Sequence, residues 1–542
     1  MIKRFVCMSV LFLTVFSGVA RSQVLRETTD KDIDVAISAL KSYLWSQQQP
    51  NGGWQLSPSY RHRYMVPVGF GTAIAVFSLL FSRRRSISST LSWLLVFTFL
   101  PYVGFVLYFF FGSTAKLKVL TRTLALQEAS LEKIPPVPDA APEECTPEAR
   151  EYTDLVSLCE SFGAQYVPGN HIELLPSAQE KYARMFAEIE QARESVCVLY
   201  FIIKTDNESG KRFLDLLARK AREGVRVRLI YDTLGYLKAR RRDFRPIIDA
   251  GGEVYHYLPS RINTLAEVNY RMHRKMVIID GRIAYTGGIN IGDDYLGLSK
   301  KITPWRDTSV RITGPAVRDI QLRFVRDCVY LDRQANPLKR RASIESPESL
   351  ALLFPPLAPC GTAGVQIVTS GPSEDESATQ TQYMRMISSA RRYLYIQTPY
   401  FVPDDAMLQT IRTAARSGVD VRIMIPGVPD KKYAYYVTTS YIGELLDWGC
   451  RVFVHHSFLH AKTFVMDDAV SSVGTTNLDV RSFHLDFEIN ALIYDRDFAV
   501  LCRETFERDM ENATEMTADQ FNRRSLKTRV SESFWRLVAP LL

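Results

Sequence analysis

The chain has 542 residues, of which 46% are hydrophobic and 23% charged, so a disordered or fibrous protein is excluded and several domains are expected. Its formal net charge of +8 suits anionic partners such as phosphates or acidic lipids. The eight cysteines are scattered without a CxxC pair, which argues against a zinc ribbon, an iron–sulfur cluster or a dense disulfide framework.

Residues 1–20 carry the pattern of a signal peptide. Lys3 and Arg4 precede an uncharged apolar run that ends in small residues at Ala20. An additional membrane anchor would show the same pattern, so both interpretations stay open.

Two uncharged stretches, residues 64–82 and 86–115, follow and are joined by three consecutive arginines. A bilayer core of about 30 Å requires about 20 helical residues, so each stretch is long enough to span. The second stretch has no polar face, which argues against a buried helix of a soluble domain. We therefore expect a transmembrane helical hairpin over residues 64–115. Positive charges favour the cytoplasmic side, and they stand both in the loop of the hairpin and directly after it, which a spanning hairpin cannot satisfy together. The sequence therefore leaves open on which side of the membrane the remaining chain lies.

The chain beyond the hairpin divides into two segments of similar size. Residues 133–150 are rich in proline and acidic side chains, and residues 336–364 are basic and then rich in proline, so both are expected to be linkers. They delimit a first half at 152–335 and a second half at 365–520, and leave a C-terminal tail at 521–542.

The two halves repeat one order of patterns. In each half an apolar strand, expected at residues 196–203 and 393–397, precedes a helical pattern that ends at Gly224 or Gly418 and leads into a β-branched strand. Strands that alternate with helices predict an α/β fold. The duplication predicts two similar halves, each a mixed sheet flanked by helices, related by pseudo-twofold symmetry.

The motif HxKxxxxD occurs once in each half, as His273, Lys275, Asp280 and as His460, Lys462, Asp467. Glycine-containing loops follow and lead to Asn290 and Asn477, which stand at the same distance from their respective histidines. Alternate side chains of a strand share a face, so the histidine and lysine of each copy should point into one site. Asp280 has the opposite parity and opens a hairpin turn, so it either contacts substrate or holds the shape of the motif, and Asp467 occupies the matching turn.

This set of side chains suits a phosphodiester. Two lysines and two carboxamides can hold its negative charge in the transition state. One histidine can attack phosphorus, while the other protonates the leaving alkoxide and then deprotonates the incoming alcohol. This chemistry requires no metal or other cofactor. The candidates for orienting the histidines are Glu488, which follows His460 in the second half, and Asp307, which follows His273 in the first.

At these residues the chain resembles the phospholipase D superfamily, whose signature is the doubled HxKxxxxD, and more narrowly the bacterial cardiolipin synthases. The narrower likeness rests on the hairpin and on residues 269–271, 305–308, 397–404, 487–488 and 536–542. It implies the phospholipase D-type fold and transfer of a phosphatidyl group between two phosphatidylglycerols, giving cardiolipin and glycerol. It also implies a multi-pass protein of the bacterial inner membrane that acts on membrane phospholipids and not on nucleic acid, with His273 as nucleophile and His460 as acid and base.

Two residues depart from the pattern of these relatives. Asp486 stands where they commonly have asparagine, and Asp294 where they often have glutamate, which bears on substrate choice. The alternatives are a hydrolase that uses water, a phosphatidyltransferase with another acceptor such as phosphatidylethanolamine, and a non-catalytic membrane scaffold. Both motifs are complete, which argues against the scaffold.

Overall fold

The computed structural model describes residues 87–99, 104, 108, 144–257, 269–298, 304–335, 344, 346–372, 374 and 376–539. All of them belong to one unit of the chain, Ser78–Leu542. The predicted signal peptide and the first predicted span, residues 64–82, lie outside the described residues. The described part of the second span is helix α5 (Ile87–Phe99) and two single residues. Within the described ranges, no helix is both long and apolar enough to cross a membrane.

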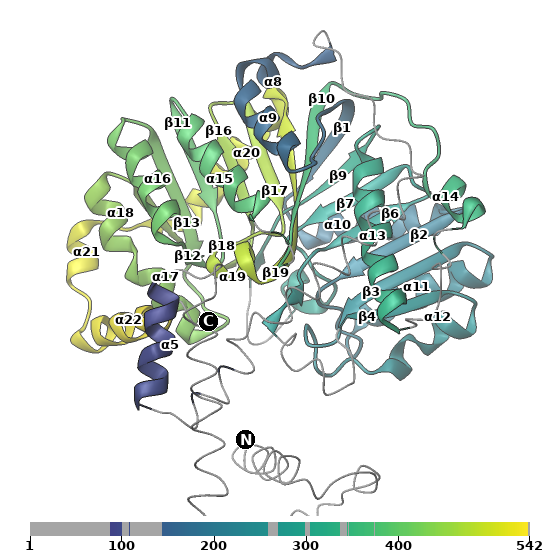
Figure 1. The fold of residues 1–542 in the computed structure, drawn as a ribbon, viewed down its shortest axis with the longest axis horizontal. Helices are drawn as coiled ribbons and strands as arrows, with labels where there is room; N and C mark the ends of the chain where they lie inside the picture. The colour runs from purple at the N-terminus through teal and green to yellow at the C-terminus, as the bar shows by residue number, and fades with distance from the viewer. Residues whose placement is uncertain are drawn as a thin grey trace, which may run out of the picture. The chain divides into compact units, whose positions relative to one another are not determined.

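Two sets of strands with the same order form one continuous sheet (Figure 1). The first half supplies β1 (Val167–Leu175), β2 (Ser195–Tyr200), β3 (Arg226–Asp232), β4 (Glu253–Tyr257), β6 (Met276–Ile279), β7 (Ile283–Gly287) and β9 (Ser309–Thr313). The second half supplies β10 (Ala363–Ser370), β11 (Tyr393–Gln397), β13 (Asp420–Pro426), β14 (Arg451–His455), β16 (Thr463–Met466), β17 (Val470–Gly474), β19 (Asp486–Tyr494) and β20 (Ala513–Glu515).

The strand order shows the predicted pseudo-symmetry. From outer edge to centre, the first half runs β4–β3–β2–β6–β7–β9–β1, and the second half runs β14–β13–β11–β16–β17–β19–β10, with β20 added outside β14. In each half three strands are parallel and the others antiparallel, and β1 joins β10 antiparallel at the centre. The predicted mixed α/β fold with two similar halves is therefore confirmed.

Five further described strands are only two residues long, and three of them take part in pairings between the halves. The five are β5 (Arg271–Met272), β8 (Trp305–Arg306), β12 (Phe401–Val402), β15 (Phe458–Leu459) and β18 (Leu478–Asp479). The strand β5 of the first half pairs in parallel with β19 of the second, and β8 of the first half pairs in parallel with β15 of the second. The remaining pair, β12 with β18, lies within the second half.

Helices cover both faces of the sheet. Those of the first half are α10 (Ala178–Gln191), α11 (Glu208–Arg222), α12 (Arg245–Asp249) and α13 (Val317–Ala335). Those of the second half are α15 (Ala378–Ser389), α16 (Asp405–Arg416), α17 (Lys432–Ser440), α18 (Ile442–Trp448), α19 (Val480–His484), α20 (Arg496–Glu511), α21 (Ala518–Asn522) and α22 (Leu526–Val538). The glycines that follow α11 and α16, Gly224 and Gly418, have φ of 92° and 93°, the left-handed conformation that ends a helix.

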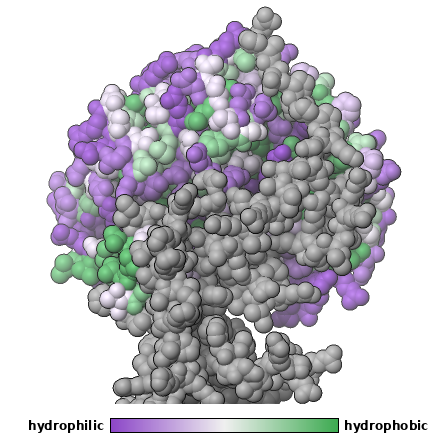
Figure 2. Space-filling view, in the orientation of Figure 1, coloured by the Kyte–Doolittle hydropathy of each residue, from purple (hydrophilic) through white to green (hydrophobic). Residues whose placement is uncertain are grey.

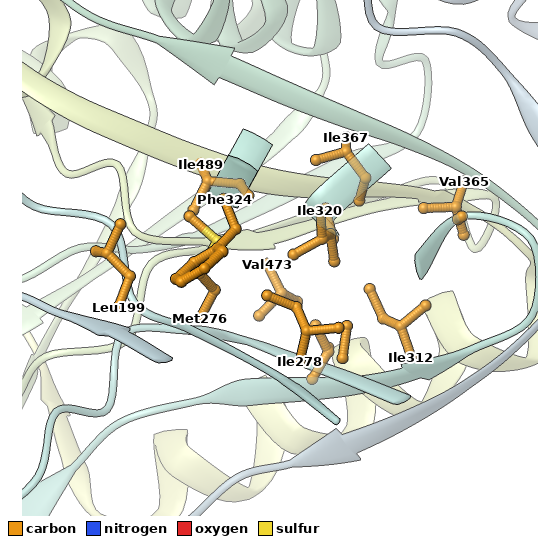
Figure 3. Close-up of a cluster of buried hydrophobic side chains, with 14 of the residues drawn as sticks. Leu199, Met276, Ile278, Ile312, Ile320, Phe324, Val365, Ile367, Val473 and Ile489 are labelled. Atoms are coloured by element: carbon orange, nitrogen blue, oxygen red, sulfur yellow. The ribbon is translucent and has the colours of Figure 1, made fainter. Parts of the chain in front are cut away.

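The halves share one core. Strand β2 is buried on both faces: Cys197 and Leu199 point into the central cluster, and Val196 and Val198 into an outer cluster under α10 and α11. Figure 3 shows the central cluster, to which both halves contribute: Leu199, Met276, Ile278, Ile312, Ile320 and Phe324 from the first half and Val365, Ile367, Val473 and Ile489 from the second. The two halves therefore pack as one body and not as separate domains.

Some elements depart from the domain boundaries expected from sequence. Helix α8 (Pro147–Glu151) occupies the end of the predicted linker 133–150, and helix α9 (Thr153–Ser161) packs into the outer cluster of the second half through Leu155 and Val156. Helix α14 (Pro347–Leu353) lies within the predicted linker 336–364. These helices are five to nine residues long, too short to show a periodic pattern in the sequence.

Candidate active site

Each HxKxxxxD motif follows one of the short strands that join the halves. His273 comes directly after β5, and His460 directly after β15. In the parallel register Met272 faces Phe487, so the next residues, His273 and Glu488, lie side by side. Leu459 faces Arg306 in the same way, which places His460 beside Asp307. The backbone pairing between halves thus brings each histidine to a carboxylate of the other half.

The two histidine–carboxylate contacts are close and buried. Nδ1 of His273 lies 2.8 Å from Oε1 of Glu488, and Nδ1 of His460 lies 2.7 Å from Oδ2 of Asp307. The histidines are 8% and 7% exposed, and both carboxylates are buried. Both predicted orienting carboxylates are therefore in place, but the structure exchanges their partners: Glu488 serves His273 and Asp307 serves His460. The sequence order suggested partners within a half, because two-residue strands leave no pattern that reveals a contact between halves.

The electrostatics of the site keep both imidazoles neutral. Burial lowers the pKa of His273 well below its usual range, and the charges of Lys275 and Lys462 lower it further. Burial and Lys462 lower the pKa of His460 to about 4, although Asp307 acts in the opposite direction. A carboxylate accepts a hydrogen bond from Nδ1–H, so the lone pair of each neutral ring lies on Nε2. This is the state required of a nucleophile or a general base.

The two motif lysines are buried beside their histidines. Nζ of Lys275 donates to the carbonyl oxygen of His273 at 2.5 Å, and Nζ of Lys462 donates to that of His460. Burial lowers the pKa of Lys275 to about 7 and that of Lys462 to about 8, although Glu488 and Asp307 respectively act to raise them. A bound anion would stabilise the charged form of both lysines.

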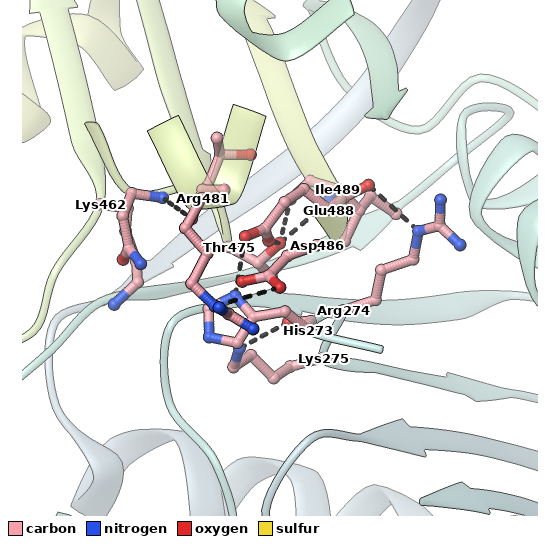
Figure 4. A network of polar contacts seen from close by, with 12 residues as sticks. His273, Arg274, Lys275, Lys462, Thr475, Arg481, Asp486, Glu488 and Ile489 are labelled. Carbon is pink, nitrogen blue, oxygen red and sulfur yellow. Dashed lines mark hydrogen bonds and ion pairs between the residues drawn. The ribbon is translucent and has the colours of Figure 1, made fainter. Parts of the chain in front are cut away.

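A third carboxyl, Asp486, lies beside the first histidine (Figure 4). Burial raises the pKa of Asp486 to about 8 and that of Glu488 to about 7. Oδ1 of Asp486 is 3.6 Å from Nε of Arg481, whose guanidinium also donates to the carbonyl oxygen of Asn269 at 2.7 Å. Figure 4 shows the Arg481 side chain reaching toward the His273 ring.

His273, Asp486 and Glu488 are the described residues whose ligand atoms come close enough to hold a metal ion, all within 4.8 Å of one another. The charges of Lys275 and Lys462 act on this group, and Arg481 adjoins it. Positive surroundings oppose a divalent cation and favour an anion. The site is thus suited to a phosphate group.

The predicted phosphate-binding asparagines are both buried. Oδ1 of Asn290 accepts a hydrogen bond from the backbone N–H of Ile202 at 3.2 Å, which fixes its orientation after β7. Oδ1 of Asn477 is buried and has no hydrogen-bond partner among the described residues.

Asp280 and Asp467 lie at the far ends of β6 and β16 from the histidines. The carboxylate of Asp280 accepts from the backbone N–H groups of Arg193, Glu194 and Ser195 at the start of β2. That of Asp467 accepts from the backbone N–H groups of residues 391–393 at the start of β11. Both aspartates have positive φ, 51° and 55°. Of the two roles left open by the sequence, these contacts favour the one that holds the motif's shape.

Sequence reasoning missed several residues that support the carboxylates. Arg274 is buried and donates to the carbonyl oxygen of Glu488 at 3.1 Å and to Asp327 at 2.7 Å. The hydroxyl of Thr475 donates to Oε2 of Glu488. At the matching position of the first half stands Gly288, where a Cβ would come within 2.1 Å of Oδ1 of Asp307. An arginine between the histidine and lysine of one motif was the visible signal for Arg274, whereas nothing in the sequence reveals the other two.

Comparison with known proteins agrees with this geometry. Residues 185–303 and 383–510 match the family described as cardiolipin synthase, PLD-like domain, and residues 71–113 match the phospholipase D-nuclease N-terminal family. The chain is 39% identical over 472 residues to the major cardiolipin synthase ClsA of Bacillus subtilis, which covers 86% of this chain and 96% of that protein. It is 37% identical over 470 residues to the cardiolipin synthase of Listeria monocytogenes serotype 4b, which covers 85% of this chain and 95% of that protein.

Among solved structures, the phosphatidylserine synthase of Haemophilus influenzae Rd KW20 aligns with a TM-score of 0.55 at 18% identity, covering 73% of this chain and 100% of that chain. This likeness supports the fold alone. The identity to the two synthases extends over nearly their full length, and it shows that this chain belongs to the cardiolipin synthase family of phospholipase D-like proteins.

Proposed function

We propose that this chain is a cardiolipin synthase, a phosphatidyltransferase that joins two phosphatidylglycerols into cardiolipin and releases glycerol. The observation that carries the proposal is the pair of buried histidines, each held at Nδ1 by a carboxylate of the other half, beside two buried lysines. The family to which the chain belongs identifies the phosphodiester as that of a phospholipid.

The first step forms a covalent intermediate. Nε2 of His273 attacks the phosphorus of the donor phosphatidylglycerol, the bond from phosphorus to the glycerol oxygen breaks, and His460 gives its Nε2 proton to that oxygen. The product is a phosphatidyl group on His273 and free glycerol. The phosphodiester brings a negative charge next to His460 and raises its pKa, so the ring can be protonated when substrate is bound.

The second step reverses these roles. His460, now neutral, takes the proton of a hydroxyl on the headgroup of a second phosphatidylglycerol. The oxygen attacks phosphorus, the phosphorus–nitrogen bond breaks, and its electron pair returns to His273. Lys275 and Lys462, with the side-chain amides of Asn290 and Asn477, hold the charge on the remaining phosphate oxygens in both steps.

We also propose that residues 64–115 form a membrane hairpin, so that the enzyme is a multi-pass protein of the bacterial inner membrane. The two uncharged stretches support this, as does the match of residues 71–113 to an N-terminal family that accompanies phospholipase D-like domains. The substrates are membrane phospholipids, so an anchored enzyme meets them in the plane of the bilayer.

Product analysis tests the proposed function. The purified full chain receives phosphatidylglycerol alone, and lipids and glycerol are quantified by mass spectrometry. We expect cardiolipin and glycerol in equal amounts from the wild type, none from His460→Ala, and wild-type amounts from the matched control His456→Ala. His456 suits this control because it is exposed and bonds Thr514 outside the site. Phosphatidic acid as the main product would instead show that water is the acceptor.

A further inference from the structure

Helix α22, which occupies most of the predicted C-terminal tail, exposes a stripe of large apolar side chains. Leu526, Val530, Phe534 and Leu537 are 75%, 60%, 57% and 74% exposed. At about 100° per residue they fall within about 80° of arc on one side of the helix. Figure 2 shows hydrophobic surface gathered at the lower left, where α22 lies in Figure 1.

Basic side chains border this stripe. Lys527 and Arg529 are exposed and fall on opposite sides of it around the helix axis. The one acidic residue of α22, Glu532, is buried on the other face, where it accepts hydrogen bonds from Thr439 at 2.8 Å and Arg524 at 2.5 Å. An apolar face with basic edges is the composition of a helix that lies in the interface of an anionic membrane.

The opposite face of α22 packs on α17 and on the start of α18. The rings of Trp535 and Tyr433 of α17 are 5.7 Å apart, and Arg536 forms an ion pair with Glu444 of α18 at 2.6 Å. Lys431, the residue before α17, is one of the charges that lower the pKa of His273, so this end of the helix is turned toward the active site. The apolar stripe is therefore packed on a helix that leads to the site.

We propose that α22 is an interfacial docking helix whose apolar stripe inserts among the acyl chains of an anionic bilayer. Lys527 and Arg529 bind lipid phosphates at the surface, and α17 then holds the active site at the level of the headgroups. The occupant of the stripe is thus the bilayer, and not a second copy or the segment 64–115. This inference rests on the proposed lipid substrate and adds the surface through which that substrate is reached.

Photocrosslinking identifies the occupant directly. Benzoylphenylalanine replaces Phe534 in the full chain, which is reconstituted into vesicles of phosphatidylglycerol and phosphatidylethanolamine and then irradiated. Leu501 on α20, 38% exposed, is the matched control position. We expect adducts with the mass of a phospholipid from position 534 and few from 501. A crosslink to residues 64–115, or a dimer of the chain, would overturn the inference whatever the enzyme's activity.

A kinetic experiment separates this inference from the proposed function. We expect the double variant Val530→Asp/Phe534→Asp to lose about tenfold or more of its rate on phosphatidylglycerol in vesicles, because charged side chains cannot enter the acyl region. Its rate on a soluble short-chain phosphatidylglycerol should stay within about twofold of the wild type, as should both rates of Leu501→Asp. Unchanged vesicle activity would overturn the docking role while leaving the function intact. A wild type inactive on both substrates would contradict the function, and the crosslink would still decide the role of α22.

Discussion

At the scale of single residues, the two histidine–carboxylate pairs differ in the pKa of their carboxyl groups. Burial would raise the pKa of Asp307, but His460 and Lys462 outweigh it and hold the pKa below its usual value. For Glu488, the effect of burial is larger than that of the neighbouring charges and hydrogen bonds, so its pKa is raised to about 7. An ionised partner stabilises an imidazolium, so the pair with Asp307 suits the histidine that carries a proton through the cycle. This difference supports His460 as acid and base.

The exchange of partners predicts which histidine each carboxylate controls. Glu488→Gln should slow formation of the covalent intermediate about 100-fold or more with any leaving group, because an amide can present its N–H group to Nδ1 and hold the nucleophile in the wrong tautomer. Asp307→Asn should slow the same step to a similar extent on phosphatidylglycerol, because glycerol leaves as the intermediate forms, but much less on a phosphatidyl ester of p-nitrophenol, whose leaving oxygen needs no proton. Rapid-quench measurement of the released alcohol and of the intermediate with both donors checks this. Glu188→Gln, which removes a carboxylate bound to Arg311 outside the site, is the control. A loss of equal size for Asp307→Asn with both donors would contradict the pairing between halves.

Replacing Asp486 by asparagine, which has the same shape but cannot ionise, should change how the stability of the fold depends on pH. Its pKa is about 8 in the fold against an ordinary value of 3.8, so the folded state retains a proton that the unfolded state releases between about pH 4 and 8. Wild-type stability therefore falls as pH rises through this window, and Asp486→Asn should not show that loss. We expect a higher Tm for the variant at pH 8, by about 1 °C for each kcal/mol recovered in a unit of this size.

The same variant should change the alkaline limb of kcat/KM. Above about pH 7 the wild-type site loses protons from Lys275 and Glu488, and above about pH 8 from Lys462 and Asp486, so its affinity for a phosphodiester falls in two steps. Asp486→Asn removes one of the two ionisations near pH 8 and should give a shallower fall in kcat/KM measured from pH 6.5 to 9.5. Wild-type and variant profiles of the same slope would show that Asp486 does not ionise beside the substrate.

At the scale of secondary structure, the motif aspartates join the hairpins to the neighbouring strands. Asp280 accepts three backbone N–H groups at the start of β2 in a left-handed conformation that asparagine also tolerates. Charge-assisted hydrogen bonds of this kind are stronger than neutral ones. The aspartate therefore fixes where β2 starts relative to the β6–β7 hairpin, and through β6 it fixes the direction of Lys275.

Substitution of this aspartate should affect folding more than chemistry. Asp280→Asn keeps the shape but loses the charge, so we expect the free energy of unfolding to fall by about 1–3 kcal/mol. The kcat of the folded fraction should remain within about threefold of the wild type. Denaturant titration and active-site-normalised rates measure the two quantities, and Asp467→Asn should behave alike. A fully stable but inactive protein would place the aspartate in the chemistry.

The longer strands and helices could be predicted from the sequence, whereas the shortest strands could not. Residues 393–397 and the helices before Gly224 and Gly418 were predictable, because burial of one helix face or both strand faces leaves a clear pattern. The two-residue strands β5 and β15 were not predictable, since a pairing of two residues is set by the packing of the halves and not by local preference. The correct partners of Glu488 and Asp307 were missed for that reason.

At the scale of the whole molecule, the fold builds one site from two halves of one chain. The central core takes side chains from both halves, and Arg274 of the first half holds the carbonyl oxygens of Glu488 and Ser370 in the second. The matched spacing of each motif and its asparagine predicted two similar halves, but not how they face each other. That relation is set by the antiparallel junction of β1 with β10 and by the short strands at the site.

This architecture predicts the absence of complementation between chains. A mixture of full-length His273→Ala and His460→Ala proteins should show no more cardiolipin formation than either variant alone, because each site draws both histidines from its own chain. Product formation in the mixture, compared with each variant at the same total concentration, measures this. Recovery of activity would mean that the halves exchange between chains.

The most direct test of a phosphatidyl transfer through His273 is to trap the intermediate. The full-length wild-type chain receives phosphatidylglycerol, is quenched during the first turnover and is digested under alkaline conditions that preserve phosphohistidine; its peptides are analysed by mass spectrometry beside those of His273→Asn. We predict a phosphatidyl group on His273 in the wild type and no adduct in the variant. An adduct on His460 in either protein, or none in the wild type, would contradict the assignment of His273 as the nucleophile.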